Sequence, residues 1–451
     1  MEKIEVISLH STIGKTDIME NLKPFLTAAE MSHVLKHALS IPNLINEDDT
    51  AIIWIDLTFL NNRIKQLKQA FPSSTTHTIA LKANPLTSIL HKMKALDVGI
   101  EVASFPEMYM AMAAGFEPEK IIFDSPSKTV SEIGFALKNG IHLNADSFTE
   151  LERIDEILKI NSSKSIIGLR INPQVGSGSI KTTSVAGEIS KFGVPISTNR
   201  HQIKKVFAKY KWLNAVHVHI GSQGCPVPLL IQGIKTVVDL VNEINVELKQ
   251  QSSNQLITAV DIGGGLPVTY HQDDKVLSMH EYNHLLKAAI PELFSGQFRI
   301  ITEFGRYIHA NAGWVSSRVE VVKRESNHAI AMVHVGADML LRECYNPQDW
   351  HHEISVTDTF GNLKNNSDKN NYMIAGPLCF SGDVIARDRQ LPVIEENDFI
   401  LIHDTGAYTF SMWSRYNSRQ MPKVIGYSDN GAHFEILKER ESLQDVANFW
   451  S

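Results

Sequence analysis

The chain has 451 residues and a formal net charge of −7, enough for two or three domains with packed cores. Its mildly acidic balance, without a basic stripe, disfavours a nucleic-acid-binding surface. Only three cysteines, no signal-like N-terminus and no long uncharged apolar run predict a cytoplasmic protein without a disulfide framework or membrane span.

Residues 1–55 carry little pattern. The segment from Glu2 to Ser8 is strand-like, and we expect this N-terminal part to join, in part, a β-rich region formed by the end of the chain.

From residue 56 onward, short apolar runs alternate with amphipathic stretches. There are eight such runs, at residues 78–82, 100–104, 121–125, 141–146, 166–170, 215–219, 259–262 and 299–303. The alternation is typical of βαβ units and a parallel sheet. Eight units predict a (β/α)8 barrel over residues 56–310, with its chemistry at the carboxyl ends of the strands. Those ends carry Lys82, Ser104, Asp146, Arg170, His219, Gly263 and Glu303.

Lys82 ends the first run, Thr78 to Lys82. A lysine among apolar neighbours is costly to desolvate unless its pKa falls or its amine is used covalently. This is the setting of a Schiff-base lysine, which pyridoxal phosphate (PLP) requires. The alternative is a solvated strand end, and only the rest of the chain decides between the two.

Two further strand ends suit a phosphate group. Gly263, Gly264 and Gly265 allow backbone N–H groups to approach an anion closely, and Ser222 adds a hydroxyl after the sixth run. A glycine run is also an ordinary turn between a strand and a helix.

His217 and His219 alternate along one strand and therefore share a face. They could be metal ligands, core histidines or, for His219, a ring stacked on an aromatic cofactor. No further ligands have compelling spacing, so we expect no metal site and favour stacking for His219. Glu303 could hold a pyridine nitrogen protonated, or could form a structural ion pair with Arg306.

Beyond residue 310 strand-like alternation replaces helical periodicity, at residues 314–322, 329–335, 372–375 and 399–403. We predict a β-rich C-terminal domain over residues 311–451, with a loose loop at residues 362–371. Cys379 follows Gly-Pro-Leu in this region, and Tyr408 follows a strand. The thiol could act as an acid or base, and the phenol could reach a phosphate.

Together these motifs resemble the PLP-dependent decarboxylases of the alanine racemase-like fold. Diaminopimelate decarboxylases are most similar and ornithine decarboxylases less so. The resemblance extends from about Asp56 to Tyr416 and includes Ala-Leu-Lys82-Ala-Asn, His-Val-His219-Ile-Gly-Ser-Gln, Arg170-Ile-Asn-Pro and Lys191-Phe-Gly. It implies a (β/α)8 barrel followed by a β-domain, and a homodimer whose active sites form between two subunits.

The resemblance also implies residue roles. Lys82 would form the Schiff base, His219 would stack on the PLP ring, and Glu303 would face the pyridine nitrogen. The phosphate would be bound by Ser222, Gly263, Gly264, Gly265 and Tyr408. Cys379 would come from the neighbouring subunit and help to protonate the carbanion after CO2 leaves. The substrate would meet Arg306, Arg342, Tyr345, Phe380 and Tyr408, and the two arginines would bind its distal carboxylate.

Three departures bear on the substrate. The family's Glu-Pro-Gly-Arg is Glu303-Phe-Gly-Arg306 here. Glu343 follows Arg342 where diaminopimelate decarboxylases have proline. In addition, Tyr345 lies three residues after Arg342, where those enzymes have a tyrosine four residues after it. Phe380 follows Cys379 where those enzymes have a glutamate that pairs with the substrate's distal ammonium. A phenyl ring accepts no such hydrogen bond.

We therefore predict PLP-dependent decarboxylation of an amino acid with a distal carboxylate and no free ammonium beside it, as in an acylated or conjugated amino acid. The alternative is a genuine meso-diaminopimelate decarboxylase that makes L-lysine. An amino-acid racemase, a non-catalytic PLP-binding protein and a plain structural barrel are the remaining hypotheses.

Overall fold

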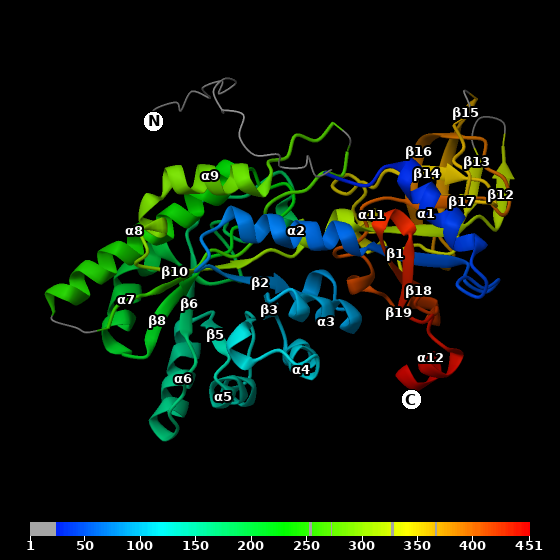
Figure 1. The fold of residues 1–451 in the computed structure, drawn as a ribbon. Helices are drawn as coiled ribbons and strands as arrows, with labels where there is room; N and C mark the ends of the chain where they lie inside the picture. The colour runs from blue at the N-terminus through cyan, green and yellow to red at the C-terminus, as the bar shows by residue number, and fades with distance from the viewer. Residues whose placement is uncertain (1–23, 252–254, 272, 326–328, 366–367) are drawn as a thin grey trace.

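The computed structural model describes residues 24–251, 255–271, 273–325, 329–365 and 368–451. The strand expected at Glu2 to Ser8 lies outside the described residues. A barrel ringed by helices occupies one side of the molecule, and a β-rich region occupies the other (Figure 1).

Eight parallel strands form the barrel. In order around it they are β2 (Thr76–Ala80), β3 (Gly99–Val102), β4 (Ile121–Asp124), β5 (His142–Ala145), β6 (Ile167–Asn172), β8 (Leu213–His217), β9 (Ala259–Asp261) and β10 (Arg299–Glu303). Pairing of β10 with β2 and of β5 with β6 closes the ring. A short strand, β7 (Val194–Pro195), extends from the end of β6. All eight predicted runs contribute a strand, and the predicted (β/α)8 barrel is confirmed.

Helices follow the strands and cover the outside of the barrel (Figure 1). They are α3 (Thr87–Ala95), α4 (Phe105–Ala113), α5 (Val130–Asn139), α6 (Phe148–Ile160), α7 (Ile196–Lys209), α8 (Val227–Gln250), α9 (Met279–Ala289) and the short α10 (Arg306–His309), while α2 (Leu57–Ala70) precedes β2. Local sequence sets their limits. In α5, Thr129 and Glu132 form a capping box, and Gly140 ends the helix in the left-handed region.

The β-rich region contains two sheets. One has the order β14 (Ile354–Thr357), β17 (Phe399–Ile402), β11 (Gly313–Arg318), β1 (Ala51–Asp56), β18 (Lys423–Ser428) and β19 (His433–Lys438). The other has the order β12 (Val321–Arg324), β13 (Ala329–Met332), β15 (Lys369–Ala375) and β16 (Val384–Pro392). Two short helices, α11 (Leu341–Tyr345) and α12 (Leu443–Phe449), complete this region.

The start of the described chain packs on this region as well. Strand β1 lies between β11 and β18, and helix α1 (Ala28–Ser40) contributes to an apolar cluster on the same sheet. In this cluster the rings of Trp54 and Trp314 stack with centroids 5.0 Å apart. The domain limits at residues 55 and 310 remain a proposal.

The alternation at residues 314–322 was read as one strand, but the chain leaves the first sheet at Arg318 and enters the second at Val321. The periodicity continues across this step and therefore does not reveal it. Five strands of the β-rich region, β1, β14, β16, β18 and β19, were not singled out from sequence. The stretch expected to be a loose loop, 362–371, already enters β15 at Lys369. Among the described helices, none is long and apolar enough to cross a membrane.

Candidate active site

Lys82 lies in a 3-10 turn (Leu81–Ala83) directly after β2. Its side chain is 43% exposed, and its Nζ forms an ion pair with the fully buried carboxylate of Glu101 on β3. Burial disfavours the charged amine, but Glu101 outweighs this effect and raises the pKa of Lys82 above its ordinary value. Burial also raises the pKa of Glu101 to about 8. Glu101 is therefore a stronger proton acceptor than an ordinary carboxylate, and it is in direct contact with Nζ of Lys82.

Glu303 ends β10 in the barrel interior and is buried. One carboxylate oxygen, Oε2, lies 3.4 Å from Nε2 of His217, whose Nδ1 lies 3.4 Å from a carboxylate oxygen of Asp124. Burial raises the pKa of Glu303, but His217 more than offsets this and lowers it to about 2. The other oxygen, Oε1, is buried without a hydrogen-bond partner in the described part of the chain. Glu303 therefore offers an ionised acceptor. Burial and the charge of Glu303 raise the pKa of the adjacent Asp261 well above its ordinary value.

The turn after β9 requires glycine at three successive positions, because its backbone conformation and close neighbours leave no room for side chains. Gly263 and Gly265 have φ of +64° and +98°, a region that favours glycine. A Cβ on Gly264 would collide with the carbonyl oxygen of Glu303, and one on Gly265 with that of Gly221. Side chains are excluded from this turn, so its backbone N–H groups can approach a ligand closely.

His219 lies beside this turn. Its Nδ1 accepts a hydrogen bond from the backbone N–H of Gly264 at 3.3 Å. Burial and the charge of Arg170 lower the pKa of His219 to about 3. The imidazole is therefore neutral, which suits stacking on an aromatic ring better than proton donation.

Arg306 begins α10, just after Glu303. Its Nε donates to Oγ of Ser222 at 3.0 Å, and its Nη1 donates to the hydroxyl of Tyr270 at 2.6 Å. Its guanidinium also lies 4.7 Å from the ring centroid of Tyr408. Arg306 thus connects the expected phosphate-binding serine with the aromatic wall of the site.

Arg342, on α11, faces the same tyrosine. Its guanidinium lies 4.5 Å from the ring centroid of Trp350 and 5.2 Å from that of Tyr408. Burial and the positive charge of Arg306 lower the pKa of Arg342, and its Nη1 is buried without a hydrogen-bond partner among the described residues. Two cations with aromatic neighbours and an unused donor are typical of a site for an anion.

Tyr408 connects these groups to the lysine. It adopts a positive φ of +58°, and its backbone N–H donates to the carbonyl oxygen of Ala83 at 3.0 Å. Strained backbone of this kind is concentrated at functional sites. The loop carrying Tyr408 is thereby fixed against the turn that carries Lys82.

Cys379 is exposed in the loop that joins β15 to β16. Its backbone N–H donates to Oδ1 of Asn417 at 2.7 Å. The loop is anchored from beneath by the buried Asp383, which accepts hydrogen bonds from the backbone N–H groups of Ala337 and Leu378, each at 2.6 Å. The carboxylate of Asp383 thus binds the backbone that carries Cys379.

Phe380 contributes to an aromatic group at the surface. Its ring stacks on Tyr345 with centroids 5.7 Å apart and meets Tyr416 edge-on at 5.9 Å. Tyr345 is 67% exposed. The structure thus divides the predicted site residues into two groups. The barrel group contains Lys82, His219, Ser222, Gly263, Gly264, Gly265, Glu303, Arg306, Arg342 and Tyr408, and the surface group contains Cys379, Phe380 and Tyr345.

Several neighbours of these residues were missed in the sequence. Glu101 was passed over because Ser104 was taken as the end of its strand, whereas Ser104 caps α4. Asp124 pairs with Arg170 at 2.7 Å and faces His217. Its position at the end of an apolar run was the available signal. Nothing in the sequence marked Tyr270 or Trp350.

Two groups in the described part of the chain have the composition of metal sites. The first is Asp124, His217 and Glu303. Burial lowers the pKa of His217, but the charges of Asp124 and Glu303 outweigh it and raise that pKa well above its ordinary value, and a protonated ring is no ligand. The second is the more exposed His271, His351 and Glu353. There the guanidinium of Arg389 lies 2.7 Å and 3.1 Å from the two ring nitrogens of His351, which opposes a cation.

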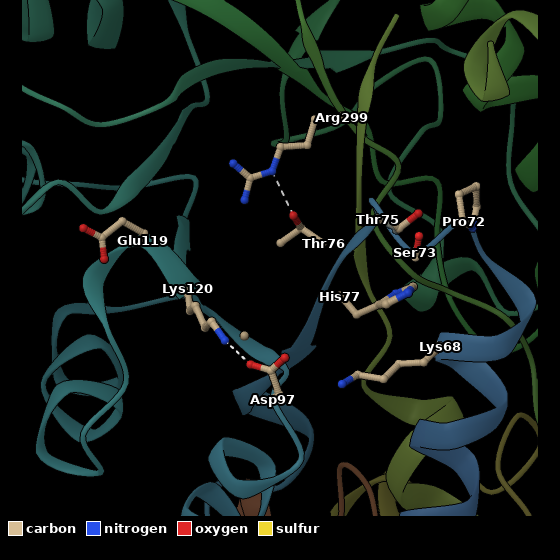
Figure 2. A pocket seen from close by; sticks show the side chains of 11 residues that line it. Lys68, Pro72, Ser73, Thr75, Thr76, His77, Asp97, Glu119, Lys120 and Arg299 are labelled. Carbon is tan, nitrogen blue, oxygen red and sulfur yellow. Dashed lines mark hydrogen bonds and ion pairs between the residues drawn. The ribbon is translucent and has the colours of Figure 1, made fainter. Parts of the chain in front are cut away.

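A separate cavity of about 380 Å³ lies at the opposite, amino-terminal end of the barrel (Figure 2). Its polar groups largely satisfy one another. Lys120 pairs with Asp97, and Arg299 Nε donates to Thr76 Oγ1 at 2.8 Å (Figure 2). None of the predicted site residues lines it. In barrels of this type this end contributes to stability, and the chemistry is at the other end.

Comparison with known proteins agrees with this geometry. Residues 57–310 match the family model described as the pyridoxal binding domain of pyridoxal-dependent decarboxylases. The diaminopimelate decarboxylase of Methanothermobacter thermautotrophicus is 30% identical over 435 residues, which cover 94% of this chain and 96% of that protein. The crystal structure of the Helicobacter pylori diaminopimelate decarboxylase complexed with L-lysine superimposes with a TM-score of 0.77 at 29% identity, covering 89% of this chain and 96% of that one.

The family model covers more than half of the chain, and the relatives are matched over nearly their whole length. Pyridoxal 5'-phosphate is therefore the cofactor, and the reaction is an amino-acid decarboxylation. The barrel with its lysine, the glycine turn and the β-rich domain identify this chain as a member of the pyridoxal-dependent decarboxylases.

Proposed function

We propose that this enzyme decarboxylates an amino acid that carries a second, distal carboxylate and has no free ammonium beside that carboxylate. The observation that carries the proposal is the pair Arg306 and Arg342, which face the same tyrosine ring, with the buried Nη1 of Arg342 lacking a hydrogen-bond partner among the described residues. Buried cations are normally paired. A substrate carboxylate would supply the missing partner.

The residues present fit the cofactor. The Lys82 amine would bind its aldehyde, the glycine turn and Ser222 would bind its phosphate, and the neutral ring of His219 would lie against its pyridine ring. The unpartnered Oε1 of Glu303 would accept the hydrogen bond of the pyridine nitrogen. When bound, PLP takes up the electron pair released from the bond between Cα and the carboxylate.

The chain's own groups would manage the protons. Glu101 contacts Nζ of Lys82 and can accept the proton that the amine must lose before it acts as a nucleophile. The charge of His217 keeps Glu303 ionised. Cys379 would donate the proton that replaces the lost carboxylate on Cα, with Lys82 as the alternative donor.

This role for Cys379 requires a second copy of the chain. Cys379 is exposed, in a loop fixed by Asp383 and Asn417, next to the exposed ring of Tyr345. A fixed, exposed loop with aromatic side chains suits an interface. We propose a homodimer in which this loop reaches the barrel of the partner. We also propose that the protein is located in the cytoplasm.

Phe380 is the reason for proposing that the substrate has no free ammonium beside its distal carboxylate. Its ring is held between Tyr345 and Tyr416 and offers no hydrogen-bond acceptor. An ammonium left without a partner in a closed site costs about 1–3 kcal/mol or more, and a cation–π contact recovers part of it. A substrate whose distal nitrogen is acylated, or absent, avoids this cost.

The second candidate is a genuine meso-diaminopimelate decarboxylase, favoured by the names of the relatives and by the L-lysine in the Helicobacter pylori structure. Replacing Phe380 separates the two. Phe380→Glu should increase turnover of free meso-diaminopimelate at least about tenfold and decrease turnover of its distally N-acylated form. A Phe380→Leu control should do neither. If wild type already prefers free meso-diaminopimelate and Phe380→Glu is neutral, the second candidate is correct.

A racemase and a non-catalytic PLP-binding protein remain as further alternatives. Measuring CO2 release alongside loss of optical rotation distinguishes them: racemisation without CO2 supports the first, and PLP binding with neither change supports the second.

A further inference from the structure

A buried ion pair lies directly behind the arginine pair. Glu343 follows Arg342 on α11, and its Oε1 lies 2.8 Å from Nε2 of His352. Both residues are 4% exposed. This is the position where the resemblance to diaminopimelate decarboxylases leads one to expect proline, so the pair is a feature of this chain.

The hydrogen bonds fix the charges of the pair. The other ring nitrogen of His352, Nδ1, lies 2.6 Å from the carbonyl oxygen of His403, which can only accept a hydrogen bond. A ring that donates from both nitrogens is an imidazolium. Burial lowers the pKa of His352, but the charge of Glu343 outweighs it and raises that pKa. Burial raises the pKa of Glu343, but the charge of His352 outweighs it and lowers that pKa. The pair joins α11 to the segment before β14 and to the end of β17.

This connection supports the aromatic walls around the arginines. Trp350 is two residues before His352, and its ring lies 5.2 Å from the Arg306 guanidinium and 4.5 Å from that of Arg342. The ring of His352 meets Tyr270 edge-on at 5.3 Å, and the Tyr270 hydroxyl accepts the hydrogen bond from Arg306. Two aromatic residues that contact the guanidinium groups, Trp350 and Tyr270, are therefore close to His352 in sequence or in space.

We propose that Glu343 and His352 are positioning residues that hold Arg342, Trp350 and Tyr270 in the arrangement that binds the distal carboxylate. The inference rests on the proposed function. Arg342 would otherwise move away from Arg306, because like charges repel and α11 is only five residues long. The negative charge of Glu343 next to Arg342 also opposes that repulsion. The pair lies outside the reacting centre, so it should affect binding more than chemistry.

The test is steady-state kinetics of the PLP-loaded enzyme with Glu343→Gln and His352→Gln. We expect KM for an amino acid with a distal carboxylate to rise at least about tenfold while kcat changes less than about threefold. The affinity for PLP should be unchanged. The conservative Glu343→Asp should recover part of the KM. A matched control is the exposed pair His334 and Glu320, also 2.8 Å apart, in which His334→Gln should leave KM unchanged.

A single variant that leaves one buried charge unpaired can fold poorly. The double variant Glu343→Leu with His352→Phe removes both charges and retains apolar volume, and it should show the same rise in KM. Unchanged KM in the folded single or double variants would overturn the inference while leaving the proposed function intact. If wild type shows no preference for a distal carboxylate, the proposed function itself fails, before any variant is measured.

Discussion

Replacing Arg342 with methionine should separate binding of the distal carboxylate from stability. Methionine retains the apolar stem that packs near Trp350 and Tyr408 but removes the guanidinium. Each hydrogen bond from a charged donor contributes about 1.5–3 kcal/mol, and at the lower end of that range losing both bonds of a two-pronged contact costs about 3–4 kcal/mol. Since about 1.4 kcal/mol corresponds to a factor of ten, kcat/KM for a substrate with a distal carboxylate should fall about 100- to 1000-fold.

Stability should change little. The variant loses contacts with two aromatic rings, worth about 0.5–2 kcal/mol. It also removes a buried cation whose Nη1 has no described partner and whose pKa is lowered by burial and by Arg306. We expect these effects to offset to within about 1 kcal/mol in the free energy of unfolding, measured by urea denaturation of the apoprotein.

The assay compares CO2 release from two amino acids of equal chain length, one with and one without the distal carboxylate. Arg63→Met is the matched control, because Arg63 also stacks on two rings, those of Phe59 and Tyr307, outside the site. An equal loss of kcat/KM on both substrates, or a loss below about fivefold, would refute the assignment of Arg342.

Three further predictions concern the cofactor site. Lys82→Ala should abolish turnover and the absorbance band of a lysine-bound cofactor; a band of wild-type intensity would contradict its role. Gly265→Ala places a Cβ against the carbonyl of Gly221 at φ +98° and should weaken PLP binding at least about tenfold in a fluorescence titration, whereas unchanged affinity would argue against the cradle. Burial raises the pKa of Glu303, but His217 lowers it to about 2. The contribution of this carboxylate to the free energy of unfolding is therefore complete above its unfolded pKa of about 4.3 and is lost as the pH falls toward 2. The difference in unfolding free energy between wild type and Glu303→Gln should be constant from about pH 6 to 8 and shrink below about pH 4.5; a difference that persists to pH 3 would exclude this titration.

The barrel could be predicted because its signals are local. Each strand is a short apolar run ending in a polar residue, and each is followed by a helix with recognisable caps such as Thr129 and Gly140. The β-rich region could be predicted only as a class. Whether β12 continues the sheet of β11 depends on pairing partners distant in sequence, and strands such as β18 pair with β1, about 370 residues away.

The site residues could be proposed one at a time, but their partners could not. Glu101 reaches Lys82, and Glu343 reaches His352, through contacts that no sequence spacing reveals. Glu343 was noticed only as a departure from an expected proline. Its contact with His352 shows that the replacement of the expected proline by Glu343 adds a buried charge pair.

The most direct measurement is the ratio of kcat/KM for distally N-acylated and free meso-diaminopimelate, determined as CO2 release by the PLP-loaded enzyme with Lys82→Ala as the blank. We expect Lys82-dependent release that favours the acylated substrate, because Phe380 provides no partner for a free ammonium. Faster release from free meso-diaminopimelate would contradict the proposed substrate and leave a conventional diaminopimelate decarboxylase.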